Sequence, residues 1–153
     1  MNYSGNERIL LIFGLTMIFI FLITPACAAA IFYKNGTDIS PDTLTKSTST
    51  NHTIVSNSEF PIEFFYSSHC GSCKDVREFL QSFERKNPGI IVRYRNLVSP
   101  GEIHQLFTEY KKQFNKNEIH YPVIFYGDIG ITGSSDIIHH LKSIISSYYV
   151  ITR

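Results

Sequence analysis

Residues 64–73 read Phe64-Phe65-Tyr66-Ser67-Ser68-His69-Cys70-Gly71-Ser72-Cys73, an apolar run followed by two thiols three positions apart. The segment after these thiols has helical periodicity, so they are expected at the start of a helix. Unpaired N–H groups and the helix dipole favour the thiolate there, and the thiolate is the nucleophile in disulfide exchange. Cys73 is close enough to attack a mixed disulfide formed at Cys70. The stretch therefore indicates dithiol–disulfide chemistry.

Composition narrows the class of protein. The chain has 153 residues, which suits one domain plus an appendage, and its net charge of +1 disfavours nucleic acid as a partner. The third cysteine, Cys27, lies in an apolar run, which leaves Cys70 and Cys73 in the folded part. A bridge that closes so short a loop stabilises by roughly 2 kcal/mol, so a purely structural disulfide is a weak explanation for the pair.

The N-terminal part is predicted to meet a membrane. Residues 1–8 form a short flank, and residues 9–33 contain no charged side chain. Such a run predicts either an uncleaved transmembrane helix or a signal peptide that is cut among the small residues 26–30. We favour the anchor because the run exceeds the usual signal-peptide core. Both alternatives send the domain to the extracytoplasmic side, membrane-anchored in the first case and secreted in the second.

Residues 34–58 are rich in Ser, Thr, Asn and Asp, with few large apolar side chains. Such a composition cannot bury enough surface to offset the entropy of ordering, so a flexible linker is predicted. Random-coil scaling gives it an end-to-end distance of roughly 25–30 Å. The globular domain is then expected over residues 59–153.

Within this domain, short apolar strands alternate with amphipathic helices. Strands are predicted at 60–67, 90–95, 121–126 and 129–132, with a two-residue turn between the last two. Helices are predicted at 73–87, from a Ser99 cap with Glu102 at N3 through Phe114, and from Ser134 or Ser135 through Tyr148. The class is therefore α/β, in the order β-α-β-α-β-β-α. The sheet should be mixed and four-stranded, with flanking helices.

This order, with Cys-x-x-Cys between the first strand and the first helix, resembles the thioredoxin fold in its minimal, glutaredoxin-like form. Tyr121-Pro122-Val123-Ile124-Phe125 is similar to the family's strand that begins with a cis-proline. Gly133-Ser134-Ser135-Asp136-Ile137 resembles the glycine turn and capped helix of glutaredoxins. The chain departs from the family at three positions: His69 replaces a Trp, Phe64 replaces a buried acid, and Thr132 replaces the first of two glycines.

The resemblance implies roles for individual residues. Cys70 is expected to be the exposed nucleophile and Cys73 the resolving thiol. Pro122 is expected in the cis form against the pair, with the backbone of Tyr121 pairing with a substrate strand. His69 either supports the thiolate and the substrate groove or is an ordinary exposed loop histidine. The full set implied for substrate binding is Tyr121, Pro122, His69, Gly133 and Ser134.

The expected function is that of a membrane-tethered thiol–disulfide oxidoreductase that needs no cofactor beyond its dithiol. Its partners would be protein or small-molecule thiols and disulfides, a redox partner that recycles it, and the membrane through residues 9–33. The direction of electron flow stays open, because no physical rule converts Gly71-Ser72 into a reduction potential. Two alternatives remain: a metal-binding or metal-delivery module using the same cysteines, and a redox-inert domain that binds peptides beside Pro122. No metal site is expected, because the other histidines form no second half-site.

Overall fold

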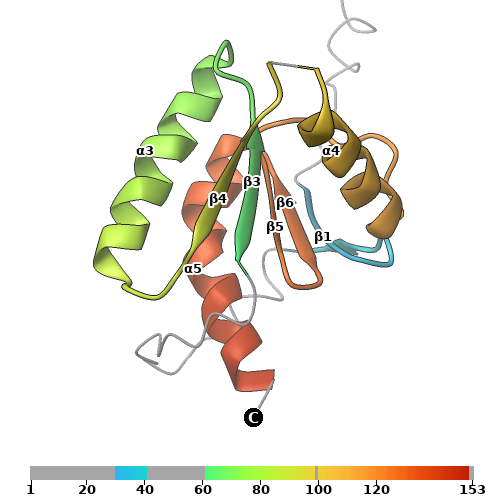
Figure 1. Cartoon of the computed structure of the whole chain (residues 1–153). Coiled ribbons are helices and arrows are strands. Elements are labelled where there is room, and N and C mark those ends of the chain that lie inside the picture. The colour runs from blue at the N-terminus through green and yellow to red at the C-terminus, as the bar shows by residue number, and fades with distance from the viewer. Residues whose placement is uncertain (1–29, 41–60, 99, 152–153) are drawn as a thin grey trace, which may run out of the picture.

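A computed structural model describes residues 30–40, 61–98 and 100–151. It contains one mixed sheet, with α3 and α5 on one face and α4 on the other (Figure 1). The strands, in the spatial order β2-β1-β6-β5-β3-β4, are β1 Ala30–Tyr33, β2 Asp38–Ile39, β3 Ile62–Tyr66, β4 Val92–Asn96, β5 Val123–Tyr126 and β6 Ile129–Thr132. The helices are α3 Gly71–Lys86, α4 Glu102–Gln113 and α5 Ser134–Ile151.

The predicted order of elements from β3 onward is confirmed. β3 and β4 are parallel and joined through α3, and β5 and β6 form an antiparallel hairpin that adds to the other edge of β3. The helices bury the faces that the periodicity predicts: Val76, Leu80 and Phe83 on α3, Phe107 on α4, and Leu141 on α5. The architecture is an α/β fold compatible with a thioredoxin-like fold.

The prediction of four strands is wrong, because the sheet has six. β1 lies within the predicted membrane segment 9–33, and β2 lies within the predicted linker 34–58. Ile31 packs in the core on the α3 and α5 side, whereas Phe32 packs in the core on the α4 side. A strand that is buried on both faces is apolar at every position, so its sequence resembles a membrane segment.

The hairpin of β1 and β2 is fixed to the domain by specific contacts. Phe32 stands opposite Gly130 of β6 and meets the ring of Phe114 edge to face, with 5.9 Å between ring centroids. Lys116 lies over the Phe32 ring at 4.9 Å and forms an ion pair with Asp38 of β2. Residues 30–40 therefore belong to the folded domain.

Within the described part of the chain, no helix combines the length and the apolar character that crossing a membrane requires. The predicted anchor, apart from residues 30–33, and residues 41–58 of the predicted linker lie outside the described residues.

The start of α4 differs from the prediction. The helix begins at Glu102 with Gly101 as its N-cap, so Glu102 is the first helical residue and does not occupy N3. Gly101 has φ 138°, a conformation that glycine adopts readily and that departs from the helical path. Ser99 lies outside the described residues, whereas Pro100 precedes the helix. The capping-box prediction is therefore wrong, because the helix starts after Gly101 and not after Ser99. The pattern of apolar residues does not show where the backbone leaves the helical path.

Candidate active site

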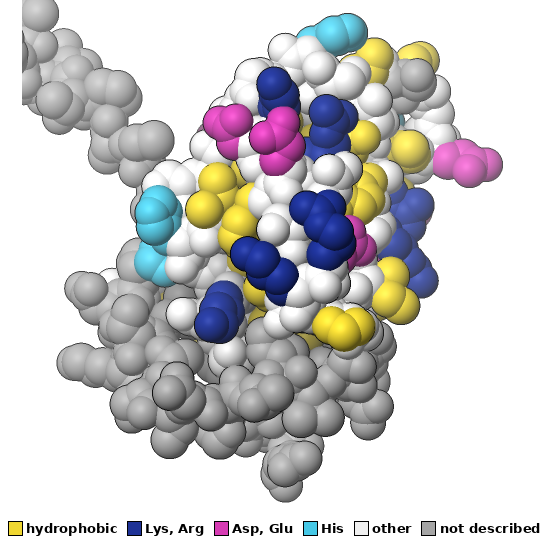
Figure 2. All heavy atoms as spheres, turned by 90° about the vertical axis from the view of Figure 1, so that its left-hand side faces the viewer, with side chains coloured by type: hydrophobic (Ala, Val, Ile, Leu, Met, Phe, Trp, Pro, Cys, Tyr) yellow, Lys and Arg dark blue, Asp and Glu magenta, His cyan; other side chains and the backbone are white. Residues whose placement is uncertain are grey.

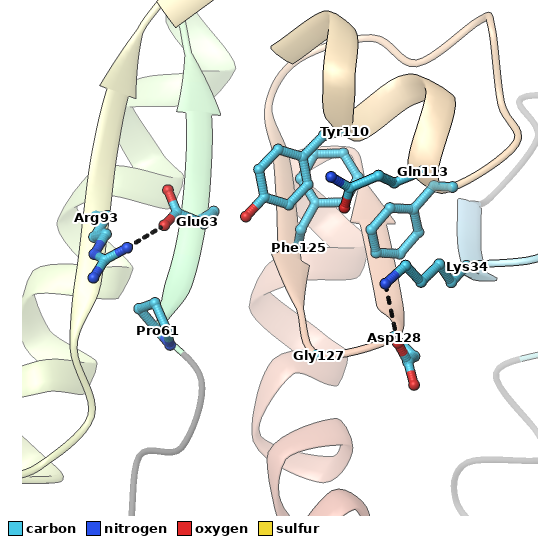
Figure 3. A pocket seen from close by; sticks show the side chains of 10 residues that line it. Lys34, Pro61, Glu63, Arg93, Tyr110, Gln113, Phe125, Gly127 and Asp128 are labelled. Atoms are coloured by element: carbon cyan, nitrogen blue, oxygen red, sulfur yellow. Dashed lines mark hydrogen bonds and ion pairs between the residues drawn. The ribbon is translucent and has the colours of Figure 1, made fainter. Parts of the chain in front are cut away.

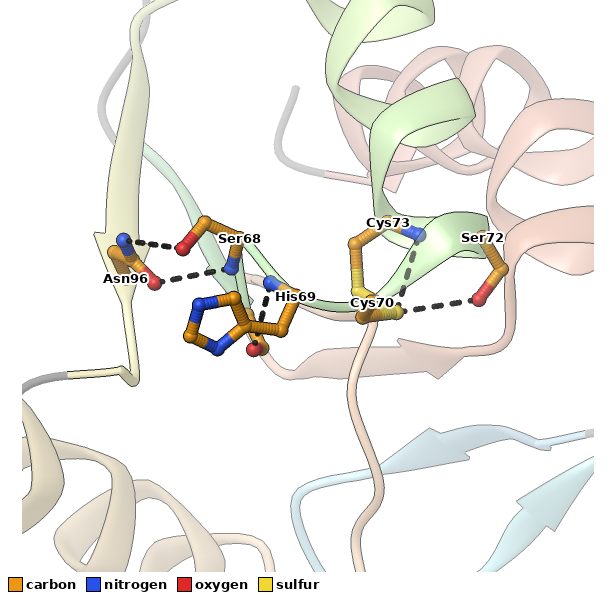
Figure 4. The surroundings of a disulfide bond; sticks show 7 residues. Ser68, His69, Cys70, Ser72, Cys73 and Asn96 are labelled. Carbon is orange, nitrogen blue, oxygen red and sulfur yellow. Dashed lines mark hydrogen bonds between the residues drawn. A yellow bond between two sulfur atoms is a disulfide. The ribbon is translucent and has the colours of Figure 1, made fainter.

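The two cysteines lie where β3 leads into α3. Cys70 and Cys73 form a disulfide, with their Cα atoms 5.3 Å apart (Figure 4). The helix begins two residues earlier than predicted, at Gly71, because Cys70 itself is the N-cap. The prediction that the pair opens a helix is confirmed.

Hydrogen bonds to Ser67 and Asn96 fix the turn before Cys70. The carbonyl oxygen of Ser67 accepts from the N–H of Cys70 at 3.1 Å, and the buried Ser67 hydroxyl accepts from the N–H of His69 at 3.2 Å. Asn96, at the end of β4, accepts from the N–H groups of Ser68 at 3.3 Å and Val98 at 3.2 Å. The neighbouring strand therefore sets the position of the turn, as Figure 4 shows. Sequence reasoning missed Asn96, the polar residue that ends β4.

Two donors surround the sulfur of Cys70. The backbone N–H of Cys73 donates to Cys70 Sγ at 3.2 Å, and the hydroxyl of Ser72 lies 3.3 Å from the same sulfur. The 16-residue helix α3 directs the positive end of its dipole at this point. When the disulfide is reduced, these groups stabilise negative charge on Cys70.

The two thiols differ in exposure in the predicted sense. Cys70 is partly exposed, whereas Cys73 is 1% exposed. A small recess beside the disulfide is lined by Tyr66, the Ser67–Ser68 turn, the two cysteines and two cations, Lys74 and Arg77. Arg77 was not recognised from the sequence, although it lies one helical turn after Cys73. An external thiol or thiolate can reach the sulfur of Cys70, and the nearby positive charges favour that approach.

The predicted cis bond is present between Tyr121 and Pro122. Val123, the first residue of β5, pairs with Phe65 near the end of β3. Tyr121 and Pro122, which precede Val123, therefore lie toward the turn that precedes Cys70. The N–H of Gly133 donates to the carbonyl oxygen of Pro122 at 2.9 Å. Tyr121 is 47% exposed.

The remaining predicted site residues lie at the same end of the sheet. Gly133, directly after β6, has φ 86°, a backbone conformation that glycine adopts more readily than other residues. Ser134 is the first residue of α5, and the His69 side chain is exposed on the turn before Cys70. The structure therefore brings the residues predicted to bind substrate to the end of the sheet that holds the disulfide.

Glu63 is a buried acid near the start of β3, whereas the cysteines follow the end of that strand. Its side chain is 5% exposed and accepts from Arg93 at 3.1 Å and Arg95 at 2.8 Å. It lies on the α4 face near the opposite end of β3, beside a pocket that a Lys34–Asp128 ion pair also lines (Figure 3). Burial raises the pKa of Tyr110 in the same pocket, with Glu63 as a second cause. This cluster links β3 to β4 on the α4 face of the sheet.

Among the described residues, no group of three or more His, Cys, Asp or Glu side chains is arranged to hold a metal ion.

No protein-family model, no curated protein and no solved structure matches this chain.

Proposed function

We propose that the protein is a membrane-tethered thiol–disulfide oxidoreductase of the thioredoxin-like, glutaredoxin-like type. The observation that carries this proposal is a disulfide whose two sulfurs differ in access. Cys70 is partly exposed at a helix N-terminus, and Cys73 is buried one turn further along α3. A structural bridge needs no such asymmetry, whereas a nucleophile and a resolving thiol do.

The reaction consists of two exchanges that move two electrons. In the reducing direction, the Cys70 thiolate attacks a substrate disulfide, forms a mixed disulfide and releases one substrate thiolate. Cys73, after losing its proton to solvent, attacks the Cys70 sulfur, forms the Cys70–Cys73 disulfide and releases the second substrate thiolate. In the oxidising direction a substrate thiolate attacks Cys70 and the steps reverse. A dithiol reductant, or a disulfide oxidant for the reverse direction, recycles the enzyme.

Substrate recognition is proposed at the edge formed by Tyr121 and Pro122. Tyr121 is exposed, and it precedes the first paired residue of β5. A substrate strand that pairs with this backbone would bring its sulfur toward Cys70. The uncharged residues 9–29 are proposed to anchor the domain on the extracytoplasmic side of a membrane.

The test uses the purified full chain in detergent, equilibrated in defined thiol–disulfide buffers. We expect a reversible two-electron transition, with alkylation of Cys70 preceding that of Cys73 after reduction. Cys70→Ser should abolish turnover of a disulfide substrate. Cys73→Ser should retain the first exchange and accumulate the mixed disulfide. Turnover that survives in Cys70→Ser would refute the mechanism.

The same preparation separates the metal-binding alternative. Zinc or copper that co-purifies with the chain and protects both thiols from alkylation, without a redox transition, would favour that alternative. Metal-free thiols that oxidise reversibly to the Cys70–Cys73 disulfide would favour the oxidoreductase.

A further inference from the structure

The described chain begins at the end of the sheet that holds the disulfide. β1 is antiparallel to β6, β6 to β5, and β5 to β3, so β1 and β3 point in opposite directions. The first residue of β1, Ala30, therefore lies at the same end as the last residue of β3, Tyr66. Figure 1 shows the start of β1 and the loop from β3 to α3 at one end of the domain.

The register confirms this arrangement residue by residue. Ala30 pairs with Thr132, Thr132 pairs with Val123, and Val123 pairs with Phe65, which places four strands in one row. Three strand spacings separate β1 from β3, which amounts to about 14 Å across the sheet. Cys70 follows four residues after β3 ends. The point at which the described chain enters the domain and the Cys70 sulfur thus lie at the same end of the sheet.

Little chain separates the apolar run from this entry point. With residues 30–33 assigned to β1, residues 9–29 remain, and about 20 residues are enough to span the hydrocarbon core. β1 is itself paired along its whole length with β6. The linker of roughly 25–30 Å that the sequence predicts between membrane and domain is therefore not available to separate them.

We propose that the disulfide end of the domain faces the membrane, and that Cys70 exchanges with a membrane protein whose thiols lie close to the bilayer surface. The inference rests on the proposed function, and in particular on residues 9–29 acting as an uncleaved anchor. A rigid strand at the membrane exit holds the reactive sulfur near the lipid headgroups. Substrates deep in the aqueous phase must reach the site from the side.

Exposed apolar side chains occur at both ends of the sheet. Tyr121 (47% exposed) and Val98 (40%) lie at the disulfide end, whereas Tyr33 (45%) and Ile91 (53%) lie at the opposite end, so the orientation rests on the position of Ala30 and not on apolar exposure. A tyrosine presents an apolar ring and a polar hydroxyl, which suits the headgroup region. The side of the domain that α3 covers instead shows Lys, Arg, Asp and Glu with scattered apolar side chains (Figure 2). No broad apolar area is visible on that side among the described residues.

The orientation can be measured without reference to activity. The full chain, with Cys27, Cys70 and Cys73 replaced by Ser, is reconstituted into vesicles of phosphatidylcholine and phosphatidylglycerol. A bimane fluorophore is attached at Val98→Cys in one variant and at Ile91→Cys in its matched control. Both positions are exposed and flank β4, but they lie at its opposite ends.

Lipids that carry a headgroup spin label should quench the bimane at residue 98 several-fold more strongly than the bimane at residue 91. Equal quenching, or stronger quenching at residue 91, would overturn the orientation. A chain that mass spectrometry finds cleaved ahead of Ala30 and free of vesicles would overturn it as well. None of these outcomes touches the redox proposal, which fails separately if Cys70→Ser keeps turnover.

A second variant tests the functional consequence. A Gly/Ser linker of about 25 residues inserted between Ala29 and Ala30 adds a reach of roughly 25–30 Å. We expect exchange with a peptide disulfide fixed to vesicle headgroups to fall several-fold, whereas turnover of a soluble disulfide stays unchanged. An insertion that leaves both rates unchanged would contradict a membrane-facing site.

Discussion

Gly130→Ala tests whether residues 30–33 belong to the domain. A Cβ atom built at Gly130 lies 2.4 Å from two atoms of the Phe32 ring, well inside the 3.5–4.0 Å at which carbon atoms pack. The ring cannot retreat, because Phe114 and Phe125 meet it edge to face with centroids at 5.9 and 6.4 Å. The substitution must therefore move either the ring or the strand.

The magnitude follows from these two responses. Strands that shift to admit the methyl group lose about 1–3 kcal/mol, as in other overpacked cores. A ring that is expelled loses the burial of a phenylalanine, about 3–5 kcal/mol. Alanine gains back less than about 1 kcal/mol over glycine in a strand. We expect the free energy of unfolding to fall by about 1–4 kcal/mol.

The assay is urea unfolding of the chain from Ala30 onward, arranged as a double-mutant cycle with Phe32→Ala. Without the Phe32 ring the new methyl group makes no steric clash, so in that background Gly130→Ala should leave the free energy of unfolding almost unchanged. Gly71→Ala is the matched control, because no atom lies within 4 Å of its added Cβ. That control should leave stability unchanged or slightly raised, since alanine suits a helix better than glycine.

The reasoning is refuted if Gly130→Ala costs the same with and without the Phe32 ring. That result would mean that β1 does not lie against β6 in solution. The same outcome would remove the basis for placing the membrane exit beside the disulfide.

Three further predictions follow from described contacts. A chain that begins at Glu59 lacks Ile31, Phe32 and Ile39, whose burial contributes about 5–9 kcal/mol in total, so circular dichroism should show it unfolded whereas the chain from Ala30 folds. Burial, and then a hydrogen bond to Glu84, raise the pKa of Tyr94, so its contribution to stability is complete below the ordinary value of 10.0 and declines as pH rises above it. Tyr94→Phe should therefore flatten the alkaline loss of stability measured by urea unfolding from neutral to alkaline pH, and an unchanged profile would contradict this assignment. Ser72→Ala should slow alkylation of reduced Cys70 at neutral pH by about 2- to 10-fold, because one hydrogen bond to the sulfur is lost. Ser68→Ala, whose hydroxyl bonds Asn96, should leave that rate unchanged, and equal slowing in both variants would contradict a direct contact.

Local patterns were enough to predict most of the domain. The helical periodicity after Cys70, the hairpin turn at Gly127-Asp128 and the proline just before β5 each act over a few residues. They therefore predicted the elements from β3 onward in order, with ends displaced by at most three residues. The candidate site was predictable for the same reason, since both cysteines lie within one turn of one helix.

Contacts between distant residues were not predictable in this way. Asn96 accepts a hydrogen bond from a turn 28 positions earlier in the chain, and Glu63 forms ion pairs with two arginines of the adjacent strand. Gly101 replaces the predicted serine cap because its backbone conformation ends the loop just before Glu102. Each of these features depends on where the chain folds back, which no short window of sequence contains.

The sequence by itself determined the local arrangement of Cys70 and Cys73, because both cysteines and the helix start occur within four consecutive residues. Only the tertiary structure showed that residues 30–39 contribute two strands to the sheet. An uncharged apolar run has the same composition in a bilayer and in a strand buried on both faces, and its partner strand β6 lies roughly 100 residues later. Because Ile31 and Phe32 are buried in the two cores, the predicted end of an anchor is instead strand β1, which lies between the short edge strand β2 and β6.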